Sequence, residues 1–190
     1  MNISEPPNHF NPFELLDIEK KAVIDLEALR ANYIKASREV HPDRFQNEGG
    51  ERLECAEKWT ALLNQANQTL KETTSRLRWL MVEEQLIDES QENSQNNEVP
   101  QELLMEAFEL QEQIEEAAQG SASDATKKKL EAARIDLQAR HDKNNEAIEA
   151  LASRWDKNSG SREEIVKEYG STIGSQNYLG PLINKIDEVL

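Results

Sequence analysis

The residues of this chain best suited to chemistry are His41 and Asp43, which flank Pro42. An imidazole and a carboxylate at this spacing could act as an acid–base pair, or they could offer hydrogen bonds to a partner protein. Because proline disfavours helical backbone in the residue before it, a helix that runs up to this tripeptide should end at about Val40 or His41. The pattern predicts an exposed loop between two helices, a place that favours docking over catalysis. The plainer alternative is a helix-stopping turn in which Asp43 caps the next segment of the chain.

Little else in the sequence favours catalysis. The histidines His9, His41 and His141 share no motif, and neither a Gly-rich phosphate loop nor a metal-ligand spacing is present. The single cysteine, Cys55, can form no intrachain disulfide and is typical of a small buried apolar residue. We therefore expect a protein that is not an enzyme and that holds no cofactor and no metal.

The composition narrows the classes of partner. The chain of 190 residues has 22 basic and 37 acidic residues, a formal net charge of −15. Such a surface repels phosphate backbones and anionic lipids, so we expect no nucleic-acid and no membrane partner. The first residues, MNISEPPNHF, lack the features of a secretory signal, and no apolar run reaches the roughly 20 residues that a membrane span needs. The expected location is the cytoplasm.

Apolar residues recur at steps of three and four, and strand-like alternation is absent, so the predicted fold class is all-α. Helices are predicted at 13–16, 25–40, 51–71, around Leu77, Leu80 and Met81, and at 100–119, 124–156 and 162–190. The core stripe expected for the second helix is Leu26, Leu29, Tyr33, Ser37 and Val40. The stripe expected for the third helix is Ala56, Trp59, Thr60, Leu63, Ala66 and Leu70.

A polar stretch at 88–99 divides the chain. It has too few apolar residues to offset the entropy of ordering, which predicts a linker. The expected domains are 1–87 and 100–190, the second an antiparallel three-helix bundle. Ser161 and Glu164 predict a capping box at the start of the last helix. Gly170, Gly174 and the Gly180-Pro181 pair should bend or break that helix.

The helix before the loop carries basic residues beside its core stripe, although the chain as a whole is acidic. The stretch LEALRANYIKASREVHPDRF, with LNQANQTLK at 63–71, resembles a J-domain, the helical hairpin by which DnaJ-type co-chaperones engage heat-shock ATPase chaperones. The resemblance implies that this surface docks on the chaperone and speeds its ATP hydrolysis. The residues expected to bind the chaperone are His41, Pro42, Asp43, Arg30, Lys35, Arg38 and Arg44.

A second group of interest lies in the run ELLMEAFELQEQIEE (102–116). Leu103, Ala107, Leu110 and Ile114 form one helical stripe, sufficient for a bundle core. A further apolar group outside that stripe adjoins glutamates at steps of three and four; its members are Leu104, Met105 and Phe108, with Glu109, Glu112 and Glu116. One interpretation is a broad core face beside a solvated acidic face. The other is a protein-binding surface, because an exposed apolar patch with an acidic rim is typical of one.

This run, together with SRLRWLM and the terminal YLGPLINKI, is similar to the HscB family, the co-chaperones of iron–sulfur cluster assembly. The resemblance implies a HscA-like chaperone partner for the first domain and the scaffold protein IscU for the second. The residues expected to bind the scaffold are Leu104, Met105, Phe108, Glu109, Glu112, Glu116 and Tyr178.

Three features depart from the family pattern or complicate its transfer. Tyr178 stands where an apolar aromatic residue is expected, and Gly180-Pro181 interrupts a stretch that would otherwise form a regular helix. The N-terminal cysteine pairs of eukaryotic members have no counterpart, which favours a bacterial-type protein without zinc.

The alternative is a general DnaJ-like co-chaperone that delivers unfolded clients to a DnaK-like chaperone. The missing Gly/Phe-rich segment and zinc-finger cysteines count against it.

Overall fold

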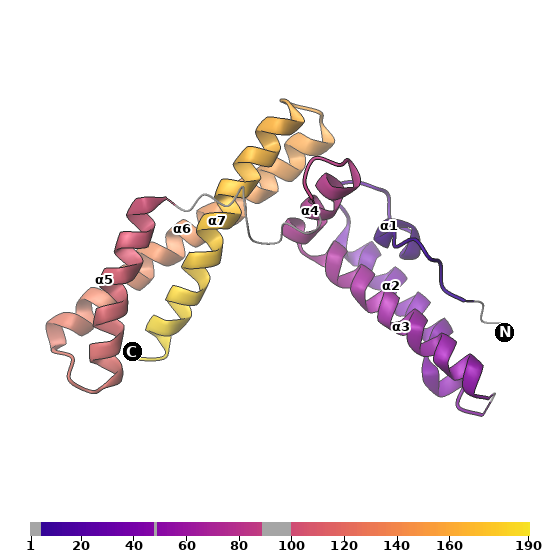
Figure 1. Cartoon of the computed structure of the whole chain (residues 1–190), viewed down its shortest axis with the longest axis horizontal. Helices are drawn as coiled ribbons and strands as arrows, with labels where there is room; N and C mark the ends of the chain where they lie inside the picture. The colour runs from indigo at the N-terminus through magenta and orange to yellow at the C-terminus, as the bar shows by residue number, and fades with distance from the viewer. Residues whose placement is uncertain (1–4, 48, 89–99) are drawn as a thin grey trace. The chain divides into compact units, whose positions relative to one another are not determined.

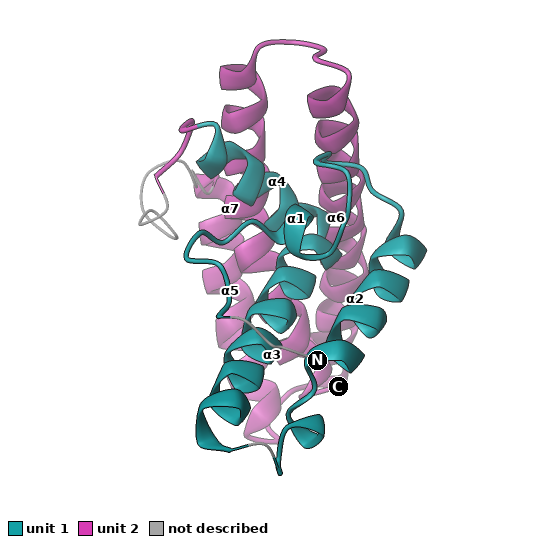
Figure 2. Ribbon diagram, turned by 90° about the vertical axis from the view of Figure 1, so that its right-hand side faces the viewer, with its two compact units in different colours: residues 1–84 teal, residues 85–190 magenta. Residues whose placement is uncertain are grey.

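The computed structural model describes residues 5–47, 49–88 and 100–190. These residues form seven α-helices and one short 3-10 helix, with no strand among them, which confirms the all-α prediction (Figure 1). The chain divides into two compact units, Met1–Glu84 and Gln85–Leu190 (Figure 2). Except for Asp88, the predicted linker at 88–99 lies outside the described residues, so it stays a prediction.

The helices of unit 1 begin and end close to the predicted residues. They are α1 (Pro12–Leu15), α2 (Leu26–Val40), α3 (Gly50–Lys71) and α4 (Thr73–Glu83). Asn11 and Asp25 cap the first two, their side-chain oxygens accepting hydrogen bonds from backbone N–H groups of the first turn. Helices α2 and α3 lie side by side as a hairpin (Figure 1).

The core of unit 1 follows the predicted α3 stripe, in which Leu63, Ala66 and Leu70 are buried. The core stripe predicted for α2 is wrong at the N-terminal end of the helix, because Leu26 is 53% exposed. Leu26 is the first residue of its helix, and the interior there contains Ala22 from the preceding connection, which is fully buried. Leu29 is the only buried residue of α2, and Tyr33, Ser37 and Val40 of the predicted stripe are partly buried.

Unit 1 also buries one arginine. Arg76 on α4 is only 3% exposed and donates from Nε to the carbonyl oxygen of Ala22 at 2.6 Å. It also donates to the carbonyl of Leu70 and, at 2.9 Å, to the hydroxyl of Thr73. These bonds satisfy a buried charge and tie the connection before α2 to the α3–α4 junction.

Unit 2 contains α5 (Gln101–Ala118), α6 (Asp124–Asp156) and α7 (Arg162–Asp187). The chain leaves α5 through Gly120, whose φ of +71° suits glycine, and the Ser121 backbone N–H donates to the carbonyl of Glu116 at 3.2 Å. The predicted capping box of Ser161 and Glu164 is present at the start of α7. Nine buried residues from the three helices form a common core: Leu103, Leu110, Ile114, Leu130, Leu137, Leu179, Leu182, Ile183 and Ile186.

The last helix was predicted to bend or break, and it does not break. Helix α7 continues through Pro181, although proline removes one backbone donor. Pro181 is exposed, so water can hydrate the backbone carbonyl, one turn earlier, that loses its helical hydrogen bond. Buried Leu179 and Leu182, on either side of the proline, pack this part of the helix into the core. Gly170 and Gly174 lie on the buried face of α7.

Candidate functional site

The predicted loop is present, and its backbone is ordered by short-range hydrogen bonds. His41 has φ −59° and ψ 129°, the extended conformation expected before proline. Residues Pro42–Arg44 form a 3-10 turn in which Arg44 N–H donates to the carbonyl of His41 at 3.0 Å. The Nδ1 atom of His41 accepts a hydrogen bond from the Asp43 backbone N–H at 3.3 Å. The imidazole thus shapes the loop while the carboxylate of Asp43 remains exposed.

Two neighbours fix this turn to the body of unit 1. Phe45, directly after it, is buried. Arg44 donates from Nη1 to the carbonyl of Arg38 at 2.9 Å, which caps the end of α2. Arg44 therefore positions the loop, a role that its sequence did not indicate. The sequence signal for the buried contact of Phe45 was an apolar residue directly after the loop.

Helix α2 carries three exposed basic residues, Arg30, Lys35 and Arg38. None of them forms an ion pair with another described residue, whereas Lys58 in the same unit pairs with Glu54 at 3.1 Å. These basic residues and the turn together are called the loop surface. Its members are Arg30, Lys35, Arg38, His41, Pro42, Asp43 and Arg44.

Helix α5 presents its second apolar group to solvent. Phe108 is 72%, Met105 61% and Leu104 40% exposed. These side chains therefore do not extend the core face of α5, which was one of the two interpretations of the sequence. Glu109, Glu112 and Glu116 are exposed as well, and none pairs with a described cation. These six residues lie on the side of α5 away from its buried stripe; together they are called the α5 patch.

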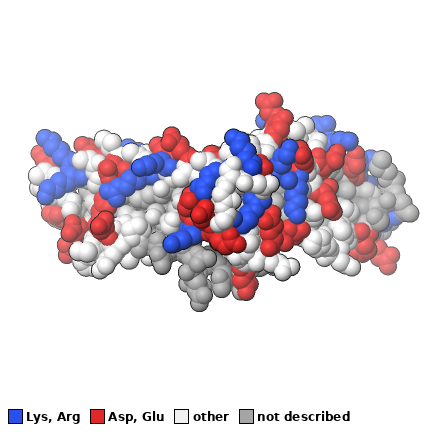
Figure 3. Space-filling view, turned by 90° about the horizontal axis from the view of Figure 1, so that it is seen from above, with Lys and Arg blue, Asp and Glu red and all other residues white. Residues whose placement is uncertain are grey.

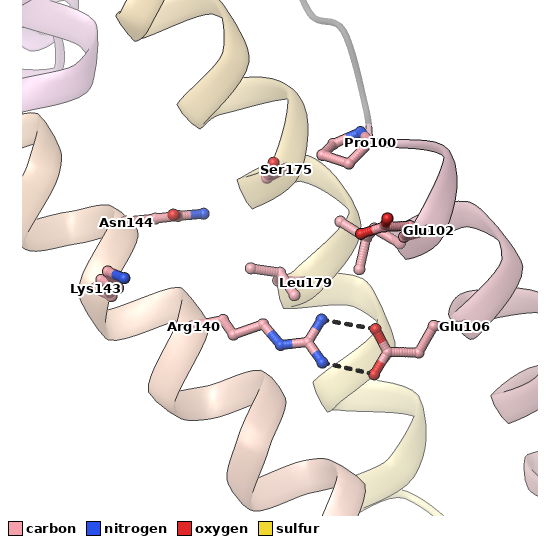
Figure 4. A pocket seen from close by; sticks show the side chains of 9 residues that line it. Pro100, Glu102, Glu106, Arg140, Lys143, Asn144, Ser175 and Leu179 are labelled. Carbon is pink, nitrogen blue, oxygen red and sulfur yellow. Dashed lines mark hydrogen bonds and ion pairs between the residues drawn. The ribbon is translucent and has the colours of Figure 1, made fainter.

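Polar contacts support the orientation of α5 on unit 2. Arg140 of α6 donates from both terminal nitrogens to Glu106, at 2.6 and 2.8 Å, and this pairing raises the pKa of the guanidinium (Figure 4). Lys185 of α7 donates to Gln111 at 3.0 Å. With the buried stripe, these contacts hold the α5 patch outward.

A pocket of about 520 Å³ adjoins the Arg140–Glu106 pair (Figure 4). Leu103 and Leu179 contribute apolar lining, and Lys143 and Glu102 contribute charges of opposite sign. This balance of charge selects neither an anion nor a cation.

Tyr178 is 43% exposed on α7, a different helix from the patch. Its role in the same surface remains a prediction.

Within the described ranges, no group of three or more His, Cys, Asp or Glu side chains could hold a metal ion. Cys55 is buried, and this burial, followed by the nearby charge of Glu5, raises the pKa of its thiol. In the part of the chain described by the structure, no helix is both apolar enough and long enough to cross a membrane.

The charges mix on the face shown in Figure 3, where Lys and Arg side chains lie among Asp and Glu. The loop surface and the α5 patch differ in the charges that they carry. The first carries unpaired cations around one exposed carboxylate, and the second carries unpaired carboxylates around exposed apolar groups. Both arrangements suit recognition of proteins.

Comparison with known sequences gives a consistent family. Residues 99–170 match a family model described as the HSCB C-terminal oligomerisation domain. The co-chaperone protein HscB homolog of Paraburkholderia xenovorans is 29% identical over 164 residues, which cover 86% of this chain and 92% of that protein. The homolog of Colwellia psychrerythraea is 30% identical over 115 residues, 60% of this chain and 64% of the relative.

Solved structures show the same fold. Chaperone HscB from Vibrio cholerae aligns with a TM-score of 0.66 at 22% identity, covering 94% of this chain and 96% of that one. Human co-chaperone protein HscB aligns with a TM-score of 0.63, also at 22% identity, over 97% and 84% of the two chains.

Proposed function

Because this chain belongs to the HscB family of co-chaperones, we propose that it is an adaptor with two binding surfaces. The loop surface, in a J-domain, engages a HscA-like heat-shock ATPase chaperone and stimulates its ATP hydrolysis. The α5 patch binds the iron–sulfur scaffold protein IscU and brings it to the chaperone. The hydrolytic machinery lies in the partner, and this chain acts by binding.

One observation carries the first half of the proposal. The carboxylate of Asp43 is exposed at the tip of a loop whose backbone is already ordered, and unpaired cations lie on the adjoining helix. A preordered loop loses little entropy on docking. Asp43 can accept a charge-assisted hydrogen bond from an arginine of the chaperone, and Arg30, Lys35 and Arg38 can attract acidic groups around it.

The second half is supported by the exposure of Phe108, Met105 and Leu104 beside unpaired glutamates. Large apolar side chains supply most of the affinity of a protein interface, and rim charges contribute orientation and rate. The patch fits a folded partner with an apolar depression bordered by basic residues. Linking both surfaces in one chain raises the effective concentration of the scaffold at the chaperone.

Single-turnover ATP hydrolysis by the chaperone tests the loop surface. Asp43→Asn removes the charge and keeps the shape, so stimulation should require roughly 30-fold more co-chaperone, a loss of about 2 kcal/mol of docking energy. Glu39→Gln is the matched control, since Glu39 is an exposed acid on α2 outside the loop surface. Equal stimulation by the Asp43→Asn variant and the wild type would refute the role given to the loop.

Titration with folded IscU tests the other surface and separates the proposal from a general DnaJ-like role. The wild type should bind folded scaffold in preference to an unfolded chain, and Leu104, Met105 and Phe108 changed together to alanine should abolish that binding. A preference for unfolded chains would instead favour the general co-chaperone.

A further inference from the structure

The outward side of α2 carries a large apolar residue among its basic residues. Ile34 is 38% exposed, and with about 3.6 residues per turn it lies on the side of the helix away from buried Leu29. Its neighbours one turn before and one turn after are Arg30, Ala31, Ser37 and Arg38. No acidic residue is among these four, so the side chains around Ile34 are either basic or small.

The nearest acids on α2 do not change this pattern. Glu27 is two turns before Ile34, and Glu39, five residues after it, lies on another side of the helix. Neither Arg30 nor Arg38 forms an ion pair with another described residue. The two guanidinium groups that border Ile34 are therefore available to a partner.

Ile34 is less exposed than another isoleucine that points away from a helix core. Ile135 on α6 is 68% exposed. Arginines stand four residues before and four residues after Ile34, whereas a glutamate and an alanine stand at those positions around Ile135. Long basic side chains lay their alkyl stems over apolar neighbours and keep the charged head in water. The difference fits coverage of Ile34 by the stems of Arg30 and Arg38, which holds their charges at its edge.

This arrangement is complementary to an apolar group that lies between carboxylates. Arg30 and Arg38 are eight residues apart, about 12 Å along the helix axis, and Ile34 is halfway between them. We propose that Ile34 is an apolar contact for the ATPase chaperone, whose facing surface carries an apolar side chain between two acidic ones. The inference rests on the proposed function and adds to the loop surface a residue that supplies affinity without charge.

The position of Ile34 makes the chaperone its partner. A surface that contacts both Arg30 and Arg38 must lie across Ile34, because Ile34 is between them. His41, where the turn begins, is seven residues further on, about 10 Å along the helix. A typical interface of about 800 Å² per partner has a radius of about 16 Å. One chaperone that engages the loop and the arginines therefore also covers Ile34.

An apolar contact and a charged contact respond differently to salt. Burial of apolar surface does not depend on the attraction between charges, so moderate salt leaves its contribution in place. The attraction between exposed arginines and acidic groups is screened as the ionic strength rises. Substitutions of Ile34 and of its two arginine neighbours should therefore differ in the salt dependence of their effects.

Titration calorimetry of the full chain with the chaperone, at about 50 mM and about 300 mM salt, tests the inference. Ile34→Gln should weaken binding about tenfold at both salt concentrations, because the exposed part of the side chain is no longer apolar. The double variant Arg30→Gln/Arg38→Gln should lose more affinity at the lower salt than at the higher. Ile34→Leu keeps the apolar area and should bind within about twofold of the wild type.

Ile135→Gln is the matched control, since Ile135 is an exposed isoleucine on a helix of unit 2, and its binding should equal that of the wild type. Wild-type affinity of Ile34→Gln would overturn the inference, and so would a deficit that vanishes at the higher salt. An equal deficit in Ile34→Leu, or a lower urea midpoint for Ile34→Gln, would assign the loss to the packing of α2 and overturn it as well.

The same measurements separate this inference from the proposed function. Loss of stimulation in Asp43→Asn with full binding by Ile34→Gln would leave the proposed function standing and overturn the inference alone. A wild-type chain that does not bind the chaperone would overturn both.

Discussion

The loop surface and the α5 patch are both exposed, but different forces hold them in place. The loop depends on contacts between residues close in sequence: a proline, a 3-10 turn, and hydrogen bonds from Asp43 to His41 and from Arg44 to Arg38. The patch occupies a regular helix whose orientation is set by contacts with distant residues, such as Arg140 with Glu106. A local surface of this kind can be altered by one backbone change. A surface set by tertiary packing tolerates such changes and is sensitive to the apolar side chains that it presents.

The largest effect expected from this contrast is on scaffold binding. Phe108→Ala should weaken the affinity for IscU about 30- to 150-fold, because truncating a central aromatic residue of an interface costs roughly 2–3 kcal/mol. Isothermal titration calorimetry measures it. Leu190→Ala is a matched control, since Leu190 is also an exposed apolar residue of unit 2. Chaperone stimulation in the absence of scaffold should stay unchanged; a joint loss of both activities would contradict the separation of the two surfaces.

The next effect concerns the local geometry of the loop. Pro42→Ala frees the backbone of His41 and Asp43, so docking must order them, at a cost of about 1 kcal/mol. Half-maximal stimulation of the chaperone should need roughly fivefold more protein. Pro100→Ala, before α5, is the control and should leave stimulation unchanged. A Pro42→Ala variant as potent as the wild type would show that preordering contributes nothing.

A smaller effect should distinguish rim charges from apolar anchors within the α5 patch. Replacing Glu109, Glu112 and Glu116 together with glutamine should slow association with IscU about 10-fold at low salt. Added salt screens exposed charges, so the association rates of variant and wild type should converge near 1 M salt, where the screening length is about 3 Å. Stopped-flow fluorescence measures both rates. A deficit independent of salt would argue against a steering role.

The smallest effect tests the polar support of α5. Glu106→Gln weakens a pair that is nearly half exposed on the Arg140 side, so the free energy of unfolding should fall by about 0.5–1 kcal/mol. Scaffold affinity should change less than twofold. Urea denaturation and calorimetry measure the two quantities. A large loss of affinity would mean that the pair, more than the buried stripe, positions the patch.

The sequence predicted most of the helices, because their signals are local. Proline before a turn, a Ser161–Glu164 box and apolar steps of three and four each act within one or two turns, and the bounds observed for α6 are those predicted. The buried stripe of α5 was also predicted from apolar steps of three and four. The same steps place Phe108 outside that stripe.

The errors arose where tertiary context decides. Leu26 has the spacing of a core residue, but buried Ala22 lies in the interior at that end of the unit. Pro181 has the chemistry of a helix breaker, but it lies on an exposed side of α7 with buried residues before and after it. The pairing of Arg140 with Glu106, 34 residues apart, has no local signal at all.

The burial of Cys55 has a consequence for a protein proposed to handle a cluster scaffold. Metals and electrophiles react with a thiolate, and both the enclosure of this sulfur and its raised pKa keep it protonated near neutral pH. The Cys55 sulfur therefore does not compete as a ligand for exchangeable iron close to the chain. Mild oxidants or alkylating reagents should likewise modify it only when α3 opens.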